Sequence, residues 1–455
     1  MMTLAEVAEA VGAKGAPLPG SITSVTTDTR SLVPGALFIA LRGERFDGHD
    51  FLSEATAGGA AAALTDRPPA RGAPPCIVVP DTRRALGALA AYWRQRMAAR
   101  VIAVTGSNGK TSVKEMVAAI LARTGPGIAT IGNLNNDIGM PLTLLRLRPE
   151  HRYAVIEIGM NRPGEIASLA AIASPHVAIV TNAGRAHLAG LKSLTAVATE
   201  KGALYPALMP GGTAIINADD PFAAYWRGLA KGPVLTYGLQ NEADVTAHAT
   251  RVAQGACVSI SVRGRPSEMI VNLKVLGEHN VANALAAVAA ALALGVPDRA
   301  VVEGLEAVRP IHGRLEAGLI SGGAQLIDDS YNANPDSAQA ALKVLAGFTG
   351  ERWFVLGDMA ELGFAAEDLH KAFGEAAREA GIEHLWTLGD LAAHASRAFG
   401  SGGRHYQDAP ALVRDLRAGL HARAVVLVKG SRSMRMERVV AGLHDEGGGH
   451  VPLAG

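Results

Sequence analysis

Residues 101–111 read VIAVTGSNGKT, an apolar run that passes directly into a glycine-rich turn ending in lysine and threonine. The run Val101–Val104 predicts a buried strand. The residues after the turn predict a helix, because apolar side chains recur on one face at Val113, Met116, Val117, Ile120 and Leu121. In such a unit, glycines let backbone N–H groups approach phosphate oxygens, and the helix N-terminus adds positive potential. The stretch therefore predicts a nucleotide-phosphate site.

The turn departs from the standard Walker A pattern. Counted back from Gly109, the first glycine of that pattern would fall at Val104, so the turn has the shorter Gly-x-x-Gly-Lys-Thr form. We expect Lys110 to reach the β- and γ-phosphates and the Thr111 hydroxyl to bind Mg²⁺. The predicted nucleotide-binding residues of this segment are Gly106, Ser107, Asn108, Gly109, Lys110, Thr111 and Ser112. The alternative is a plain glycine turn, and the loop alone does not identify a reaction.

The bulk composition describes a globular chain without a strong overall field. Hydrophobic residues make up 49% and charged residues 19% of its 455 residues, and the formal net charge is +1. It has no basic stripe of the kind found in nucleic-acid-binding domains, so no nucleic-acid partner is expected. The two cysteines, Cys76 and Cys257, lie far apart, which argues against a disulfide framework and a zinc site. The start lacks a signal-peptide pattern, and apolar runs such as 282–294 are shorter than the ~20 residues that span a bilayer. We therefore expect a soluble cytoplasmic protein that does not enter a membrane.

The order of apolar runs and helical patterns predicts an α/β fold with mostly parallel sheets covered on both faces. At about 100–200 residues per domain, several domains are expected, and we divide the chain into residues 1–97, 98–310 and 311–455. The predicted strands are 36–41, 76–79, 101–104, 153–157, 177–180, 213–216, 326–329, 353–356, 385–388 and 425–428. Helices over 83–97 and 280–294 are expected near the ends of the first two domains, and the glycine-rich end, 446–455, is expected to fray.

Two polar side chains follow predicted strands of the second domain. Glu157 ends the strand 153–157, and the carboxyl end of a parallel strand is where such sheets bind ligands, so this carboxylate is a natural Mg²⁺ ligand. His187 follows the strand 177–180. A lone histidine is usually structural. His187 is a candidate site residue only because a strand end brings it towards Glu157. The alternative for Glu157 is a helix cap or a solvated surface residue.

Further segments carry a resemblance to a known family. They are GNLNNDIGMPLT at 132–143, EIGMNRPGEI at 157–166, AHL at 186–188, GEHNVANA at 277–284, HGRLE at 312–316, DDSYNANP at 328–335, LGDMAELG at 356–363 and KGSR at 429–432. Together they resemble the Mur ligases, the ATP-dependent amide-forming enzymes of peptidoglycan precursor synthesis, over nearly the whole chain. The segments NLNN and DDSYNANP are most similar to the member that adds D-alanyl-D-alanine. The phosphate loop alone is shared with other Mur ligases and with folylpolyglutamate synthases.

The resemblance implies a three-domain fold: a central P-loop-type domain flanked by an N-terminal UDP-binding domain and a C-terminal Rossmann-like domain. It also implies that a peptide carboxylate attacks the ATP γ-phosphate, and that an amine then displaces phosphate from the acyl phosphate. Because the first step joins two anions, its barrier is largely electrostatic. By resemblance, one Mg²⁺ is held through Thr111 and Glu157 and a second by His187. The implied catalytic residues are Lys110, Lys201, His187 and Asn135, with Lys201 carbamylated to N6-carboxylysine. Without the resemblance, Lys201 would be read as an ordinary surface lysine.

The resemblance also implies how the substrates are held. Asn280 is expected to contact adenine, with His279 and Asn283 shaping the same pocket, and Arg314 and Asp329 are assigned to the ATP phosphates and ribose, so that the third domain must close on the second. The substrates that the resemblance implies are UDP-N-acetylmuramoyl-tripeptide and D-alanyl-D-alanine. Their expected contacts are Thr27, Asp28, Arg30 and Arg42 for the UDP end, Asn135 and Asn136 for the acceptor peptide, and Tyr331, Asn332 and Asn334 for D-alanyl-D-alanine.

Competing interpretations remain open at this stage. Another Mur ligase or a folylpolyglutamate-synthase-like amide ligase would share the phosphate loop, although the NLNN and YNANP runs argue against both. A nucleotide-switch ATPase would leave the polar strand ends of the third domain without a role. A UDP-sugar-binding module would leave Lys110, Thr111 and Glu157 idle. The resemblance is compatible with a monomer, and the sequence does not reveal the third residue of the acceptor peptide.

Overall fold

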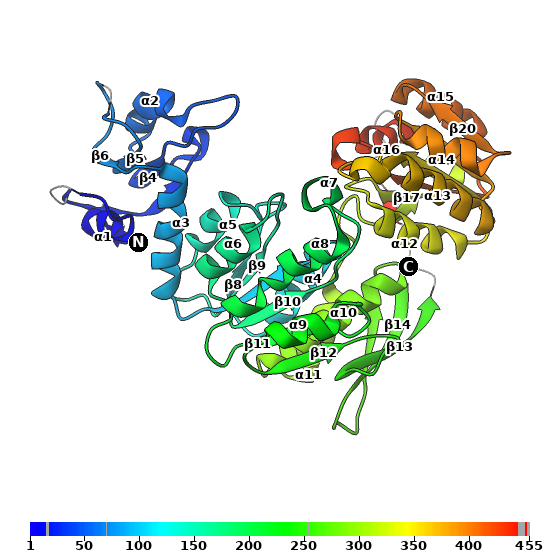
Figure 1. The fold of residues 1–455 in the computed structure, drawn as a ribbon, viewed down its shortest axis with the longest axis horizontal. Coiled ribbons are helices and arrows are strands. Elements are labelled where there is room, and N and C mark those ends of the chain that lie inside the picture. The colour runs from blue at the N-terminus through cyan, green and yellow to red at the C-terminus, as the bar shows by residue number, and fades with distance from the viewer. Residues whose placement is uncertain (15–17, 70, 253–254, 445–450, 453–455) are drawn as a thin grey trace.

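The computed structural model describes residues 1–14, 18–69, 71–252, 255–444 and 451–452. Its sheets form three α/β regions, as predicted (Figure 1). We call residues 1–97, 98–310 and 311–455 the N-terminal, central and C-terminal regions, and these boundaries remain predictions. Figure 1 shows the N-terminal and C-terminal regions at opposite ends of the central one. Most of the segment 446–455 lies outside the described residues, so its fraying is not tested.

The N-terminal region has a parallel sheet in the order β3-β4-β5-β6 and a small antiparallel pair of β1 with β2. Its strands are β1 (Met2–Thr3), β2 (Ser21–Ile22), β3 (Ser24–Thr26), β4 (Ala36–Ile39), β5 (Ala62–Thr65) and β6 (Cys76–Val78). Its helices are α1 (Leu4–Ala10), α2 (Leu52–Ala57), α3 (Thr82–Gln95) and the short 3-10 turns η1 (Thr29–Ser31) and η2 (Gly48–Phe51). Helix α3 ties this region to the central one, because Trp93 Nε1 donates to Leu147 O at 3.0 Å and Arg94 Nε donates to Ala173 O at 3.1 Å.

The central region has a nine-stranded sheet in the order β15-β14-β13-β12-β11-β10-β7-β9-β8. The strands β7 (Arg100–Thr105), β8 (Gly127–Ala129), β9 (Tyr153–Glu157), β10 (Val177–Val180), β11 (Thr213–Asn217) and β12 (Val234–Tyr237) are parallel, which confirms the prediction. An antiparallel ladder was not predicted and extends this sheet: β13 (Val245–Val252), β14 (Gly255–Val262) and β15 (Met269–Leu273). The helices are α4 (Lys110–Leu121), α5 (Gly139–Leu144), α6 (Glu165–Ala173), α7 (Leu188–Leu191), α8 (Leu194–Gly202), α9 (Ala223–Leu229), α10 (Glu278–Ala293), α11 (Asp298–Ala307) and the 3-10 turn η3 (Tyr205–Ala207).

Both faces of the parallel strands around β7 are buried, as the apolar runs predicted. Along β7 the side chains alternate: Val101 and Ala103 belong to one hydrophobic cluster, and Ile102 and Val104 to another. The second cluster includes the predicted apolar stripe of α4, at Val113, Met116, Val117, Ile120 and Leu121. Helix α4 therefore packs on the sheet through the face that its spacing predicted.

The C-terminal region has a seven-stranded sheet in the order β20-β19-β18-β21-β17-β16-β22. Its strands are β16 (Glu316–Leu319), β17 (Gln325–Asp329), β18 (Glu351–Gly357), β19 (His384–Leu388), β20 (Gly403–Tyr406), β21 (Ala424–Lys429) and β22 (Val451–Pro452). β16 pairs with β17 and β22 in antiparallel fashion, and the other pairs of described strands in this sheet are parallel. Its helices are α12 (Pro335–Ala346), α13 (Ala366–Glu379), α14 (Ala392–Phe399), α15 (Ala409–Gly419) and α16 (Glu437–Leu443), with 3-10 turns η4 (Ser321–Gly323), η5 (Gly363–Ala365) and η6 (Arg432–Met434). Among the described residues, no helix is both long enough and apolar enough to cross a membrane.

Candidate active site

The phosphate loop connects the carboxyl end of β7 to the first turn of α4, and its two glycines are required by the backbone. Gly106 has φ +149°, and a Cβ placed on it would lie 1.8 Å from Thr181 Oγ1. Gly109 has φ +81°, and its Cβ would lie 2.4 Å from Asn283 Oδ1. No side chain fits at either position without movement of the neighbour. The loop therefore has the open backbone that phosphate binding needs.

The end of β10 holds this loop in place. Thr181 Oγ1 donates to Asn108 O at 2.6 Å, and Asn182 Oδ1 accepts from Asn108 N at 3.0 Å. Ser107 Oγ donates to Gly184 O at 3.1 Å. No role was predicted for Thr181 and Asn182 from the sequence, although both follow a predicted strand directly. These contacts leave the loop backbone supported from the neighbouring strand end.

Thr111 and Glu157 lie side by side at the carboxyl ends of β7 and β9, which are adjacent strands. Thr111 Oγ1 donates to Glu157 Oε2 at 2.9 Å, and Asn135 Nδ2 donates to Glu157 Oε1 at 2.7 Å. The Glu157 side chain is buried, with 2% of the residue exposed. A hydroxyl and a carboxylate at this separation are hard oxygen ligands of the kind that Mg²⁺ prefers.

The Lys110 ammonium turns back onto the loop. Its Nζ donates to Gly106 O at 2.7 Å and to Ser107 O at 3.4 Å. Burial lowers the pKa of Lys110, while the nearby Glu157 carboxylate acts in the opposite direction. The side chain thus lies at the glycine turn, within reach of an anion bound there.

Lys201 is not on the surface. It lies near the end of α8, and only 1% of the residue is exposed. Burial holds the pKa of Lys201 well below its usual value, and the positive charge of Lys110 lowers it further. Among the described residues, its ammonium donates no hydrogen bond that would compensate for burial of the charge. The neutral amine is therefore favoured at this position.

His187 faces the C-terminal region. Its Nδ1 lies 2.6 Å from Glu361 Oε2, and Ala189 N donates to Glu361 O at 2.9 Å. The hydrogen bond with His187 lowers the pKa of Glu361. Both residues have positive φ, +58° at His187 and +62° at Glu361. Within the described part of the chain, no hydrogen bond or ion pair joins His187 to Glu157, so the structure does not bring these two predicted metal ligands into contact.

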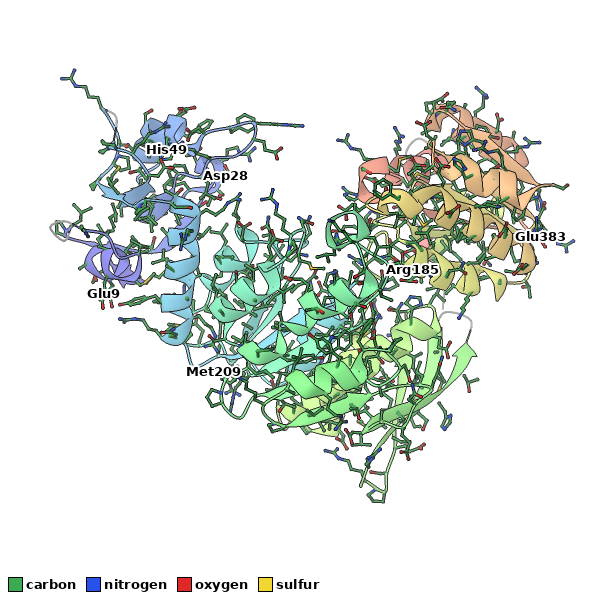
Figure 2. All side chains as sticks on the ribbon, viewed as in Figure 1. Glu9, Asp28, His49, Arg185, Met209 and Glu383 are labelled. Atoms are coloured by element: carbon green, nitrogen blue, oxygen red, sulfur yellow. The ribbon has the colours of Figure 1, made fainter. Side chains whose placement is uncertain are left out.

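The C-terminal region reaches the phosphate loop through several side chains. Arg314 Nη2 donates to Thr111 Oγ1 at 3.0 Å, and the Arg314 guanidinium stacks 4.3 Å from the Tyr331 ring centroid. Asn334, the N-cap of α12, donates through Nδ2 to Asn108 Oδ1 at 2.7 Å. Figure 2 labels Arg185 at the junction of the two regions. Its Nη2 pairs with Asp336 Oδ1 at 2.7 Å.

Asp329 lies deeper in the C-terminal region. Its carboxylate accepts from Lys429 Nζ at 2.5 Å, and Lys429 Nζ also donates to Asn332 O at 2.9 Å. Burial raises the pKa of Asp329, against the opposing effect of Lys429. Asn332 Oδ1 accepts from Arg432 N at 3.2 Å, so its amide is partly used in holding the loop after β17.

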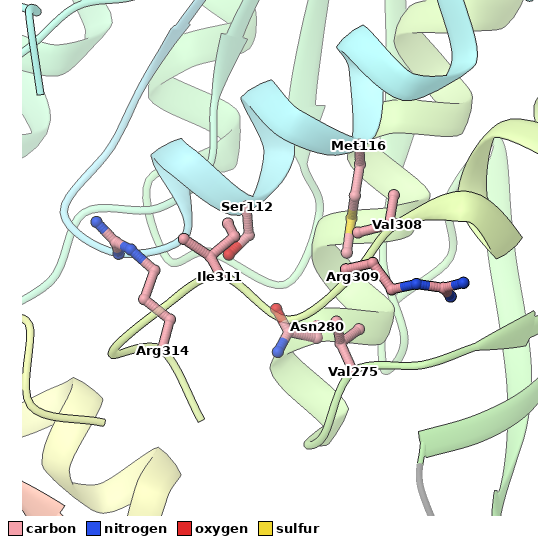
Figure 3. Close-up of a pocket in the computed structure, with 8 residues that line it drawn as sticks. All are labelled: Ser112, Met116, Val275, Asn280, Val308, Arg309, Ile311 and Arg314. Atoms are coloured by element: carbon pink, nitrogen blue, oxygen red, sulfur yellow. The ribbon is translucent and has the colours of Figure 1, made fainter. Parts of the chain in front are cut away.

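A small pocket lies between α4, the start of α10 and the segment that leads into the C-terminal region (Figure 3). Its lining residues are Ser112, Met116, Val275, Asn280, Val308, Arg309, Ile311 and Arg314. Asn280 Nδ2 donates to Leu276 O at 2.8 Å, and its Oδ1 accepts from Asn283 Nδ2 at 2.9 Å. One pocket is therefore lined by three predicted nucleotide contacts, Ser112, Asn280 and Arg314. Asn283 donates to Asn280 in this pocket and also lies against Gly109.

The predicted UDP contacts lie apart from this site. Figure 2 shows Asp28 in the N-terminal region, well separated from Arg185. Arg30 Nη2 pairs with Asp28 Oδ2 at 2.7 Å, and this hydrogen bond lowers the pKa of Asp28. Arg42 Nη2 pairs with Asp66 Oδ1 at 3.0 Å, and Thr27 is half-buried. The predicted UDP contacts belong to the N-terminal region, which has a separate sheet. A substrate would therefore have to span the regions to reach both these residues and the phosphate loop.

Comparison with known proteins identifies the family. The Mur ligase family catalytic domain matches residues 21–94, the Mur ligase middle domain matches 104–291, and the Mur ligase glutamate ligase domain matches 313–432. The chain belongs to the Mur ligase family. The predicted resemblance and the predicted α/β fold of this Mur ligase are thus confirmed.

Individual relatives agree with this placement. The UDP-N-acetylmuramoyl-tripeptide–D-alanyl-D-alanine ligase of Escherichia coli (strain K12) is 45% identical to this Mur ligase over 430 residues, covering 94% of this chain and 95% of that protein. A crystal structure of MurF from Acinetobacter baumannii superposes with a TM-score of 0.90 at 37% identity and covers 97% of this chain and 98% of that one. MurF from Thermotoga maritima, solved in complex with ADP, superposes with a TM-score of 0.83 at 26% identity and covers 92% of this chain and 96% of that one.

Several residues at or near the site of this Mur ligase were not predicted from the sequence. Asp336, Glu361 and Lys429 each pair with a site residue or its neighbour. A signal existed for Glu361 and Lys429, which lie inside the segments LGDMAELG and KGSR. Asn136 was predicted to contact substrate, and its Oδ1 accepts from Ile138 N at 3.2 Å and Gly139 N at 2.9 Å, so its carbonyl group supports the start of α5.

Proposed function

We propose that the chain is an ATP-dependent ligase that joins D-alanyl-D-alanine to the tripeptide carboxylate of UDP-N-acetylmuramoyl-tripeptide, releasing ADP and phosphate, in peptidoglycan precursor synthesis. The relative from Escherichia coli, which matches nearly the full chain, carries this activity in its name. The observation that carries the proposal is the Thr111–Glu157 pair beside Lys110, with Arg314 in contact with Thr111. This group combines the oxygen ligands and the cations that a triphosphate needs.

The residues present fit a bound Mg²⁺. Thr111 Oγ1 and Glu157 Oε2 supply two oxygen ligands, and Asn135 fixes the second carboxylate oxygen by donating to it. When bound, Mg²⁺ would offset the charge on the phosphate oxygens during attack by the peptide carboxylate. Lys110 and Arg314 would add positive charge on the same group, because both side chains already lie at the loop.

The contact with Glu361 determines how a second metal could bind at His187. Its Nδ1 is engaged with Glu361, so either Nε2 serves as the ligand or the contact with Glu361 opens. A hydrogen bond from Nδ1 to a carboxylate is the usual support for a histidine that binds metal through its other nitrogen. We favour Nε2 as the ligand, with Glu361 orienting the ring.

Carbamylation of Lys201 is supported by its surroundings. The neutral amine is the form that reacts: its nitrogen attacks CO₂, forms the N–C bond and releases a proton, leaving a carbamate anion. Burial and Lys110 both favour that neutral amine, and the carbamate would then place a negative charge where Lys110 is the neighbouring cation. The test is ¹³C NMR of the protein in ¹³C-bicarbonate. A carbamate carbon signal that is absent from Lys201→Met supports the assignment, and identical spectra of the two proteins exclude it.

The proposed substrate contacts form separate groups for the UDP end, the acceptor peptide and the incoming dipeptide. Thr27, Asp28, Arg30 and Arg42 would bind the UDP end, with Asn136 beside the peptide and Tyr331, Asn332 and Asn334 at the incoming D-alanyl-D-alanine. Because Asn334 is paired with Asn108, the C-terminal region would shift to admit the dipeptide and would close again over ATP. The cytoplasmic location and the monomeric state stay predictions.

A substrate panel tests the proposed function. ADP release from ATP should require UDP-N-acetylmuramoyl-tripeptide and D-alanyl-D-alanine together, and should disappear in Lys110→Ala while the far-UV circular dichroism spectrum is kept. Precursors with lysine or diaminopimelate at the third position would identify the acceptor. ATP hydrolysis at one rate whatever the amine would exclude ligase activity. Turnover with a single amino acid in place of the dipeptide would reassign the chain to another branch of the family.

A further inference from the structure

His312, Glu316 and Asp328 form a cluster at the start of the C-terminal sheet, outside the proposed ATP site. Glu316 on β16 and Asp328 on β17 are directly opposite each other in the antiparallel register. Two carboxylates in directly opposite positions repel one another, so this pairing is unfavourable unless a positive charge lies between them. His312 faces both carboxylates.

The two carboxylate oxygens of Asp328 differ in their hydrogen bonding. The residue is 1% exposed, and its Oδ1 accepts from Ser330 N at 3.0 Å. Its Oδ2 is buried, and no described residue gives it a hydrogen-bond partner. A buried carboxylate oxygen without a partner is costly, and native structures usually satisfy such an atom with a donor, a water or an ion.

The three side chains converge on one point. His312 Nδ1 lies 3.1 Å from Glu316 Oε2 and 3.8 Å from Asp328 Oδ2, and the three candidate ligand atoms all lie within 4.8 Å of one another. Ligand atoms at about 2.1 Å from a tetrahedral metal are separated from each other by about 3.4 Å. The two measured separations lie on either side of that value, so an ion fits with small side-chain adjustments.

We propose that His312, Glu316 and Asp328 bind a divalent transition-metal ion of the Zn²⁺ or Mn²⁺ class. An imidazole nitrogen with two carboxylates suits these ions, whereas Mg²⁺ and Ca²⁺ favour oxygen ligands alone. His312 has 81% of its side chain exposed, which gives the ion access from solvent and leaves room for a water as the fourth ligand. The site is separate from the Thr111–Glu157 pair and does not depend on the proposed function.

The position of the cluster indicates a structural role for the ion. Arg314 lies between His312 and Glu316 in the chain and donates to Thr111 of the phosphate loop. Its backbone N donates to Ile311 O at 2.9 Å within a tight turn. An ion that ties His312 to β16 and β17 would fix both ends of this turn, and would therefore restrict where Arg314 can point.

Metal titration of the full-length protein tests the site. Metal-free protein, without nucleotide or Mg²⁺, is titrated with Zn²⁺ and separately with Mn²⁺ by calorimetry, and Co²⁺ absorption bands report the coordination of the same site. The expected result includes one site whose affinity falls by more than about tenfold in His312→Ala and in Asp328→Asn. It should stay within a few-fold in Glu157→Gln and His187→Ala, which alter the other proposed metal ligands.

The outcomes separate the proposal from simpler explanations. Because His312 is exposed, His312→Ala should fold, and circular dichroism checks this; Glu316→Gln serves as a second variant if Asp328→Asn does not fold. Absence of wild-type binding to all three ions overturns the proposal. Equal affinity in the wild type and His312→Ala overturns it as well, since the ion would then bind elsewhere.

Discussion

Arg314 Nη2 donates a 3.0 Å hydrogen bond to Thr111 Oγ1, and the same hydroxyl donates to Glu157 Oε2 at 2.9 Å. A cation from the C-terminal region thus lies directly on the proposed Mg²⁺ ligands of the central region. The Arg314 guanidinium also stacks on Tyr331. The proposed ATP site is therefore formed by residues from two regions of the chain.

Arg314→Lys should therefore impair catalysis more than folding. Lysine keeps the charge but cannot both donate at this position and stack on Tyr331. We expect kcat/KM for ATP to fall by about 10²–10³-fold, the range for loss of one well-placed donor at a developing charge. Steady-state ADP release measures this. Arg299→Lys, at an exposed position on α11, is the matched control and should behave as wild type. Unchanged kinetics in Arg314→Lys would remove Arg314 from the site.

Glu157→Gln should separate activity from stability. Glutamine keeps the oxygen that Thr111 can donate to but loses the charge that favours Mg²⁺, so activity should fall by at least about a hundredfold. The protein should stay folded but lose about 1–3 kcal/mol in the free energy of unfolding, because the amide nitrogen that replaces Glu157 Oε1 would face the Asn135 Nδ2 donor. Thermal unfolding and ADP release are compared, with Thr111→Ser expected to retain activity and Thr111→Val to lose it. An active Glu157→Gln at low Mg²⁺ would contradict the metal assignment.

The sequence allowed the local part of this site to be predicted, for a physical reason. Thr111 and Glu157 follow apolar runs that form adjacent parallel strands, so their meeting at one sheet edge follows from the topology. The buried faces of β7 and α4 likewise follow from periodicity. Burial of Lys201 could not be read from residues 199–202, where it depends on packing around α8.

The contacts between regions were beyond reach for a different reason. Asn108 meets Asn334, and His187 meets Glu361, although more than 150 residues separate the members of each pair. No periodicity connects polar side chains across that distance, so their pairing depends on how two folded units dock. The ladder β13–β15 was not predicted, because its strands have an alternating pattern and not the continuous apolar runs of the predicted parallel strands.

Gly109→Ala should be strained in two separable ways. Its φ of +81° disfavours any side chain, and a Cβ would lie 2.4 Å from Asn283 Oδ1. We expect a loss of about 1–3 kcal/mol in the free energy of unfolding, together with loss of nucleotide binding. In a double-mutant cycle, Asn283→Ala should relieve the steric part, so that the double variant loses about 1 kcal/mol less than the sum of the single variants. Urea unfolding measures all four proteins. Strict additivity would show that the two residues do not touch.

His176 should make the stability of the fold depend on pH. Its Nδ1 accepts a hydrogen bond from Val101 N at 3.0 Å, and burial, aided by the charges of Arg94 and Arg100, lowers the pKa of His176 to about 4. The unfolded chain has the ordinary histidine pKa of about 6.5 and therefore binds more protons than the folded chain between pH 6.5 and 4. The contribution of His176 to stability is complete above pH 6.5 and is lost as the pH falls towards 4.

The measurement is the free energy of unfolding by urea between pH 4.5 and 7.5, in the wild type and in His176→Asn. Asparagine retains an acceptor for Val101 N but does not titrate, so the variant should lose less stability than the wild type as the pH falls. The difference between the two proteins isolates His176 from the carboxylates that titrate over the same range. Parallel pH profiles would mean that His176 is protonated as easily in the folded chain as in the unfolded one. The assignment of His176 Nδ1 as the acceptor for Val101 N, near the start of β7, would then be wrong.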